Sequence, residues 1–117
     1  MTPPTVLVVD DDEAIRVTVC EMVTMCGRVG VPAEDGRAAL TLLRAGLRPA
    51  LVLLDLRMPG MNGWEFRAEL LGDPELADIP VVILSCEAAS ADMKKIAAQL
   101  RKPFEIEELL ALVRRLT

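Results

Sequence analysis

The sequence predicts an α/β domain in which helices cover both faces of a parallel β-sheet. Short runs of aliphatic, often β-branched residues alternate along the chain with segments whose apolar residues recur at helical spacing. Short connections separate these segments, and right-handed crossovers between them produce a three-layer sandwich. The chain has 117 residues, of which 52% are apolar. That is enough to bury a core without disulfides, so we expect one domain over residues 1–117.

The first strand is expected at 5–9, where five β-branched or aliphatic residues precede an acidic run. The helix after it has Asp12 as a plausible N-cap and Gly27 as a plausible stop. A weaker strand at 28–33 contains Pro32, which indicates an edge of the sheet because proline cannot donate a backbone hydrogen bond. The remaining elements are expected as helices at 35–45, 64–71, 91–97 and 105–116 and strands at 50–54, 81–84 and 98–101.

Composition excludes several classes of function. The formal net charge is −5 without a basic cluster, so direct nucleic-acid binding is not expected. The chain has no histidine, which excludes histidine triads, histidine-ligated zinc and a phosphohistidine carrier. No apolar run approaches the roughly 18 residues of a membrane span, and the N-terminus lacks the features of a signal peptide.

The three cysteines, Cys20, Cys26 and Cys86, have no metal-like spacing. Cys20 and Cys26 fall in an apolar helical pattern, so they are expected to be buried core thiols. This usage fits a reducing compartment and predicts a cytoplasmic protein.

Polar side chains directly follow the apolar runs of four expected strands. Asp10 and Asp11 come after the first strand, Asp55 after the third, Ser85 after the fourth and Lys102 after the fifth. Ligands of open parallel sheets bind at the carboxyl ends of the strands. We therefore expect these side chains to face one crevice.

Clustered carboxylates repel one another unless some are protonated or a cation neutralises them. Oxygen ligands without histidine or thiolate suit a hard ion such as Mg²⁺. A lysine and a divalent cation beside Asp55 would stabilise a transferring phosphoryl group, and the carboxylate itself would be the nucleophile. The alternative for the acidic run is a helix cap and a solvated turn, which is the interpretation adopted for Asp12.

Three segments carry a resemblance to a known family: VLVVDD at 6–11, LLDLRMPGMNG at 53–63 and KPF at 102–104. In this order and spacing they resemble the receiver domain of response regulators in two-component signal transduction. The resemblance covers essentially the whole chain. It implies a flavodoxin-like (βα)5 fold, similar to chemotaxis receivers, with sheet order 2-1-3-4-5.

The resemblance also implies roles for individual residues. Asp11 would ligate Mg²⁺ directly and Asp10 through water. Asp55 would be both a ligand and the phosphoacceptor, and the backbone carbonyl of Arg57 would complete the protein ligands. Lys102 would contact the phosphoryl group.

Ser85 would form a hydrogen bond to the phosphoryl group and act as a switch residue. The donor would be a phosphohistidine on a sensor histidine kinase or a histidine phosphotransfer protein. The module would catalyse its own phosphoryl transfer and dephosphorylation, and it would signal to a downstream protein or to an output domain that this chain lacks.

Two features depart from the family pattern. Gln99 occupies the second switch position, three residues before the lysine, where an aromatic residue is usual. The interval between Ser85 and Lys102 is also shorter by roughly five residues, which is more than one helical turn. The fourth helix is therefore expected to be shortened or irregular, with an unusual output surface on that face.

Two residues that should flank the phosphoryl site, Arg57 and Glu87, prompt a smaller hypothesis: they pair across it and shield the phosphoryl group from water. Trp64 is expected to pack beside the same loop, where it could report on the site. The main rival function is a pseudo-receiver, a binding module that is not controlled by phosphorylation. A small phosphohydrolase is less well supported, because Arg57 stands where a second aspartate would act as acid and base.

Overall fold

The computed structural model describes residues 3–85 and 96–117. Its five parallel strands form one sheet in the order β2-β1-β3-β4-β5, so the expected order is confirmed. The strands are β1 (Thr5–Val9), β2 (Val29–Ala33), β3 (Leu51–Asp55), β4 (Val81–Ser85) and β5 (Ala98–Arg101). Pro32 lies in β2 at one edge of the sheet, as its chemistry predicts.

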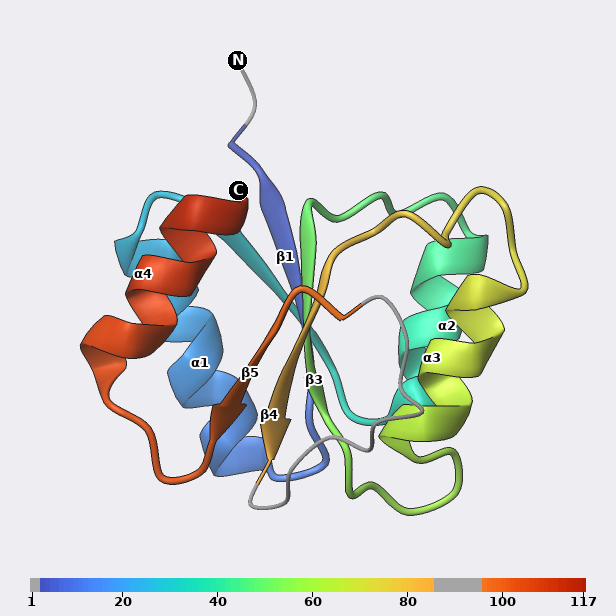
Figure 1. The fold of residues 1–117 in the computed structure, drawn as a ribbon, viewed down its shortest axis with the longest axis horizontal. Coiled ribbons are helices and arrows are strands. Elements are labelled where there is room, and N and C mark those ends of the chain that lie inside the picture. Colours follow the sequence, from blue (N-terminus) through green and yellow to red (C-terminus); the bar gives the residue numbers. More distant parts are fainter. Residues whose placement is uncertain (1–2, 86–95) are drawn as a thin grey trace.

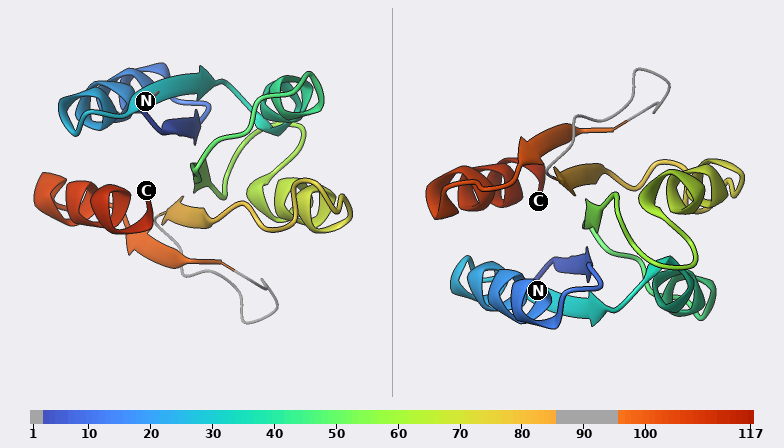
Figure 2. Two further views of the ribbon diagram at one scale, coloured as in Figure 1. Left: turned by 90° about the horizontal axis from the view of Figure 1, so that it is seen from above. Right: turned by 90° about the horizontal axis from the view of Figure 1, so that it is seen from below.

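Four helices lie among the described residues and cover both faces of the sheet. They are α1 (Glu13–Met25), α2 (Gly36–Arg44), α3 (Gly63–Leu71) and α4 (Ile106–Leu116). Helices α1 and α4 pack on one face, and α2 and α3 pack on the other (Figure 1). The end-on views in Figure 2 show the three layers. None of these helices is long and apolar enough to cross a membrane.

Each face of the sheet has its own apolar core. Alternate residues of a strand point to opposite faces, so Leu54 packs towards α2 and α3 while Leu53 packs towards α1 and α4. Every residue of β3 and β4 is buried. A strand buried on both faces is apolar along most of its length, which explains the continuous runs that precede Asp55 and Ser85.

The helix boundaries follow the capping residues. The side chain of Asp12 accepts a hydrogen bond from the backbone N–H of Ile15 (3.1 Å), which confirms it as the N-cap of α1. Gly27, just after α1, has a φ of 78°, a conformation that glycine adopts without a steric penalty. Asn62 caps α3 and forms a capping box with Glu65.

Two expected strands were one residue too short at their carboxyl ends. Asp55 and Ser85 belong to β3 and β4, because Asp55 is in register with Leu84 and Ser85 with Arg101. The other boundaries of the described elements differ from expectation by one residue or agree with it; β5 agrees at both ends.

The expected fourth helix at 91–97 falls mostly outside the described residues, as do Cys86 and Glu87. Its last two residues were predicted wrongly. Ile96 and Ala97 are not helical, because the N–H of Ala97 already donates to the Val81 carbonyl (2.8 Å) as the chain approaches β5. Cys20 and Cys26 pack against the α1–α4 core but are only partly buried.

Candidate functional site

The carboxyl ends of β1 and β3 bring three aspartates together. These strands are neighbours in register up to Val9 and Leu54, so Asp10 and Asp11 follow β1 beside Asp55, the last residue of β3. One carboxylate oxygen from each of the three aspartates lies within 4.8 Å of the others. The expected acidic cluster is therefore present, and its oxygen donors fit a hard divalent cation.

The three carboxylates differ in burial. Asp10 and Asp55 are 3% and 8% exposed, whereas Asp11 is exposed to solvent. Burial raises the pKa of Asp55 above its usual value of 3.8, and the charges of Asp10 and Asp11 raise it further. Lys102 and the backbone N–H of Arg57 act in the opposite direction.

The Lys102 side chain reaches the acidic cluster from the loop after β5. Its Nζ donates to Oδ2 of Asp10 (3.1 Å) and lies 3.9 Å from Oδ2 of Asp55. The backbone N–H of Lys102 donates to the Ser85 carbonyl (2.9 Å), which continues the pairing of β5 with β4. The Lys102–Pro103 peptide bond is cis. The ammonium group is thus held among the carboxylates, closer to Asp10 than to the expected acceptor.

Both carboxylate oxygens of Asp10 accept hydrogen bonds, one from the β1–α1 turn and one from the loop after β5. Oδ1 accepts from the backbone N–H of Asp12 (2.9 Å), and Oδ2 accepts from Lys102. The backbone N–H of Asp10 donates to the Ala33 carbonyl on β2 (3.2 Å). Asp10 is therefore fixed in place, whereas the neighbouring Asp11 projects into solvent.

The start of α3 is pressed against the backbone next to Asp55. The N–H of Gly63 donates to the Leu56 carbonyl (2.9 Å). A Cβ at Gly63 would lie 2.8 Å from both the Asp55 carbonyl oxygen and the Leu56 Cα, so no side chain fits there. This close approach fixes the β3–α3 loop relative to Asp55.

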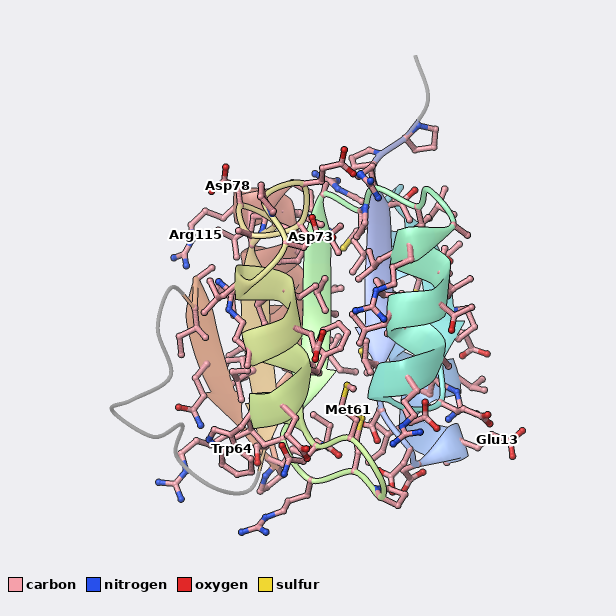
Figure 3. The ribbon with its side chains drawn as sticks, turned by 90° about the vertical axis from the view of Figure 1, so that its right-hand side faces the viewer. Glu13, Met61, Trp64, Asp73, Asp78 and Arg115 are labelled. Atoms are coloured by element: carbon pink, nitrogen blue, oxygen red, sulfur yellow. The ribbon has the colours of Figure 1, made fainter. Side chains whose placement is uncertain are left out.

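Arg57 follows Asp55 by two residues, and its backbone N–H donates to Oδ1 of Asp55 (3.3 Å). The Arg57 guanidinium carbon lies 5.6 Å from the centre of the Trp64 ring, within the range of a cation–π interaction. In Figure 3, Trp64 and Met61 lie at the carboxyl end of the strands, opposite Asp73 and Asp78. Trp64 therefore packs beside the site, as expected, through a contact that the sequence did not reveal.

Ser85 and Gln99 occupy different levels of the β4–β5 pair. Ser85 is buried at the end of β4, level with Arg101. Gln99 pairs with Ile83, two residues further from the crevice, and is only partly buried. Ser85 thus lies at the carboxyl end of the strands, where the aspartates are, whereas Gln99 lies further back along its strand.

Two arginines were not predicted to be important. The Arg16 guanidinium donates to the backbone carbonyl of Asp10 (2.8 Å). Arg67 on α3 is 2% exposed, and burial lowers its pKa. The position of Arg16 within two helical turns of the acidic run is a signal that could have identified it, but nothing in the helical pattern around Arg67 indicated a buried charge.

Comparisons with family models and with curated proteins point to the same family. The model of the response regulator receiver domain matches residues 6–114. The chain is 37% identical to the response regulator MprA of Mycolicibacterium vanbaalenii over 97% of its own length and 50% of that protein. It is also 37% identical to the DNA-binding dual master transcriptional regulator RpaA of Synechocystis, over 97% of this chain and 48% of that protein. The chain thus spans about half the length of these curated relatives.

Solved structures agree in fold. The chemotaxis protein CheY4 of Vibrio cholerae superposes with a TM-score of 0.88 at 28% identity, covering 99% of this chain and all of that one. The receiver domain of the Francisella response regulator 1452 gives a TM-score of 0.85 at 29% identity, covering 97% and 95% of the two chains. With its acidic pocket and lysine in the expected places, the chain belongs to the response regulator receiver domain family of two-component signalling.

Proposed function

We propose that this chain is the phosphoacceptor module of a two-component or phosphorelay system and accepts a phosphoryl group on Asp55 with Mg²⁺. One observation carries the proposal. Three carboxylates gather within 4.8 Å of one another, and the Lys102 ammonium lies 3.9 Å from the proposed acceptor. This arrangement places positive charge where a phosphoryl group would develop negative charge.

The contacts of each carboxylate support the proposed division of roles in metal binding. Asp10 already accepts two hydrogen bonds, which favours contact through water. Asp11 is exposed and Asp55 lies within reach of it, so these two supply direct ligands. The Arg57 carbonyl is the proposed backbone ligand because its residue is tied to Asp55. Mg²⁺ would neutralise the cluster and polarise an oxygen of the incoming phosphoryl group.

The donor would be a phosphohistidine on a sensor histidine kinase or a histidine phosphotransfer protein. A carboxylate oxygen of Asp55 attacks phosphorus, the P–N bond breaks, and the electron pair returns to the imidazole, which takes a proton from solvent. Lys102 stabilises the equatorial oxygens, and the Ser85 hydroxyl then donates to the transferred group. Ser85 and Gln99 are the proposed switch residues. The chain would also catalyse its own dephosphorylation.

The signal would pass to a downstream protein or to an output domain, since the curated relatives extend well beyond the matched half. The free thiols Cys20 and Cys26 support a reducing cytoplasm as the place of the reaction. Glu87 lies outside the described residues, so the proposed Arg57–Glu87 pair has no geometry to support it here.

The proposal is tested by incubating the protein with Mg²⁺ and either acetyl phosphate or phosphoramidate and measuring its intact mass. We expect one phosphoryl adduct on the parent protein, none on Asp55→Asn and none after Mg²⁺ is chelated. Absence of an adduct with both donors, together with absence of Mg²⁺ binding, would instead support the pseudo-receiver, which the Gln99 switch position favours.

A further inference from the structure

The turn between β1 and α1 carries two of the proposed metal ligands. Two backbone N–H groups of this turn form hydrogen bonds: the N–H of Asp10 donates to the Ala33 carbonyl on β2, and the N–H of Asp12 donates to the Asp10 carboxylate. The register of β1 with β2 and β3 ends at Val9. The carbonyl of Asp10 therefore lies beyond the paired part of the strand.

The Arg16 side chain provides a donor for that carbonyl. Arg16 sits on α1, with its own N–H bonded to the carbonyl of the N-cap residue Asp12 (2.9 Å). From there its guanidinium Nη1 reaches back to the Asp10 carbonyl oxygen at 2.8 Å, in a partly buried position. Asp10 is thus held through its backbone N–H by β2 and through its carbonyl by α1.

The Asp10 carbonyl belongs to the planar peptide unit that joins Asp10 to Asp11. Fixing this oxygen fixes the plane of the unit, and the hydrogen bond from the Asp12 N–H to the Asp10 carboxylate holds the next peptide unit. With both peptide units around Asp11 held, the direction in which its side chain leaves the backbone is restricted. Asp11 is the exposed member of the acidic cluster. Rotation of the peptide plane would therefore turn the Asp11 carboxylate away from the other two.

We propose that Arg16 is a positioning residue for the metal site: by holding the Asp10–Asp11 peptide, it orients the Asp11 carboxylate towards Asp55, where these two residues would hold Mg²⁺. This inference rests on the proposed function, because it requires a cation at the acidic cluster. On this inference Arg16 acts through the backbone carbonyl of Asp10, to which its guanidinium donates.

Charge alone predicts the opposite behaviour, which makes the inference easy to test. A guanidinium close to a cation site repels the cation, so removal of Arg16 would tighten Mg²⁺ binding if electrostatics were its main contribution. If positioning is its main contribution, removal weakens Mg²⁺ binding. The sign of the change in affinity therefore separates the two explanations.

The experiment compares Mg²⁺ dissociation constants from isothermal titration calorimetry for the parent protein, Arg16→Met, Arg16→Lys and Arg44→Met. Met keeps most of the hydrocarbon chain and removes the donor, whereas Lys keeps a charged donor that can partly replace it. Arg44, paired with Glu69 near the end of α2, is the control for loss of one positive charge away from the site. Circular dichroism and Tm without Mg²⁺ establish that each variant is folded.

We expect Arg16→Met to weaken Mg²⁺ binding about tenfold, as loss of a charge-assisted hydrogen bond implies. Arg16→Lys should fall between Met and the parent, and Arg44→Met should match the parent. Raising the Mg²⁺ concentration should partly restore labelling of Arg16→Met by acetyl phosphate, because the variant loses affinity for the cation.

Unchanged or tighter Mg²⁺ binding by a folded Arg16→Met or Arg16→Lys protein would overturn the inference and leave the proposed function standing. Absence of Mg²⁺ binding by the parent protein would overturn both.

Discussion

Strands β1 and β3 lie inside the sheet, whereas β5 lies at its edge, and the two regions contribute to the site differently. The apolar residues of β1 from Val6 onward and all of β3 are buried, and they deliver three aspartates to one point. Strand β5 is largely half-buried and delivers a single cation, Lys102, from the loop that follows it. The proposed acceptor chemistry thus rests on the most buried strands of the fold.

The departures from the family pattern gather in the other region. Gln99 is on β5, and the shortened interval lies between β4 and β5. We therefore expect the proposed acceptor and metal site to tolerate little change, whereas the β4–β5 side, where the signal would leave the domain, should tolerate more. The following predictions test this division, from the largest expected effect to the smallest.

Replacing Lys102 tests the one contribution that the edge strand makes to the chemistry. Lys102→Met should slow labelling by acetyl phosphate about 100-fold, as expected when a preorganised cation is removed from a transferring group. It should also tighten Mg²⁺ binding, because Lys102 then no longer competes for the Asp10 carboxylate. Labelling kinetics and calorimetry measure the two effects. Equal labelling of the parent and the variant would show that the edge strand contributes nothing to transfer.

Replacing Gly63 tests the rigidity of the central region. Gly63→Ala places a Cβ 2.8 Å from backbone atoms of Asp55 and Leu56, so we expect a loss of about 1–3 kcal/mol in the free energy of unfolding and slower labelling. Gly72→Ala at the end of α3 is the matched control, because its nearest neighbour would be 3.5 Å away. Its effect should stay within about 0.5 kcal/mol. Chemical denaturation measures both, and equal effects would refute the close-approach argument.

Replacing Asp55 tests the electrostatic cost of the acidic cluster without Mg²⁺. The pKa of Asp55 is raised in the folded protein, so the folded state binds more protons than the unfolded state between the unfolded value, near 3.8, and the higher folded value. Stability therefore falls as pH rises through that interval, and the loss persists to neutral pH.

Accordingly, Asp55→Asn should have a Tm a few degrees above the parent's at neutral pH in the presence of a chelator. The difference should shrink as pH falls below the folded pKa, and it should shrink when Mg²⁺ is added, because only the parent gains from the cation. Asp78→Asn, an exposed position at the far end of the molecule (Figure 3), is the control. A lower Tm for Asp55→Asn than for the parent would contradict the burial argument.

Replacing Gln99 should have the smallest effect on the chemistry. Gln99→Ala on the half-buried edge strand should label within twofold of the parent and unfold within about 0.5 kcal/mol of it, whereas Ser85→Ala, at the site, should label several-fold more slowly. Parallel labelling time courses decide this. A large loss of labelling in Gln99→Ala would show that β5 is part of the acceptor machinery and would break the comparison.

The sequence predicted the features that depend on local order. The alternation of strands and helices predicted a parallel sheet covered on both faces. The polar residues that directly follow apolar runs, such as Asp10 and Asp55, predicted the members of the acidic cluster. It failed by one residue at the ends of β3 and β4, because the hydrogen-bonded ladder continues through Asp55 and Ser85 after the apolar run has stopped.

Contacts between elements were beyond the sequence. The Arg57–Trp64 stack, the bond from Arg16 to Asp10 and the burial of Arg67 all depend on how helices and loops pack against one another. A charged residue in an amphipathic pattern is normally solvated, so the pattern alone gives the wrong expectation for Arg67.

The central claim is that Asp55 itself accepts the phosphoryl group, and chemical trapping of the labelled residue tests it most directly. After labelling with acetyl phosphate and Mg²⁺, borohydride reduces an acyl phosphate to the alcohol, which converts a phosphorylated aspartate into homoserine. Peptide mass spectrometry should then find homoserine at position 55 and aspartate at positions 10 and 11. Homoserine at 10 or 11, or a borohydride-resistant phosphate on Ser85, would contradict the account.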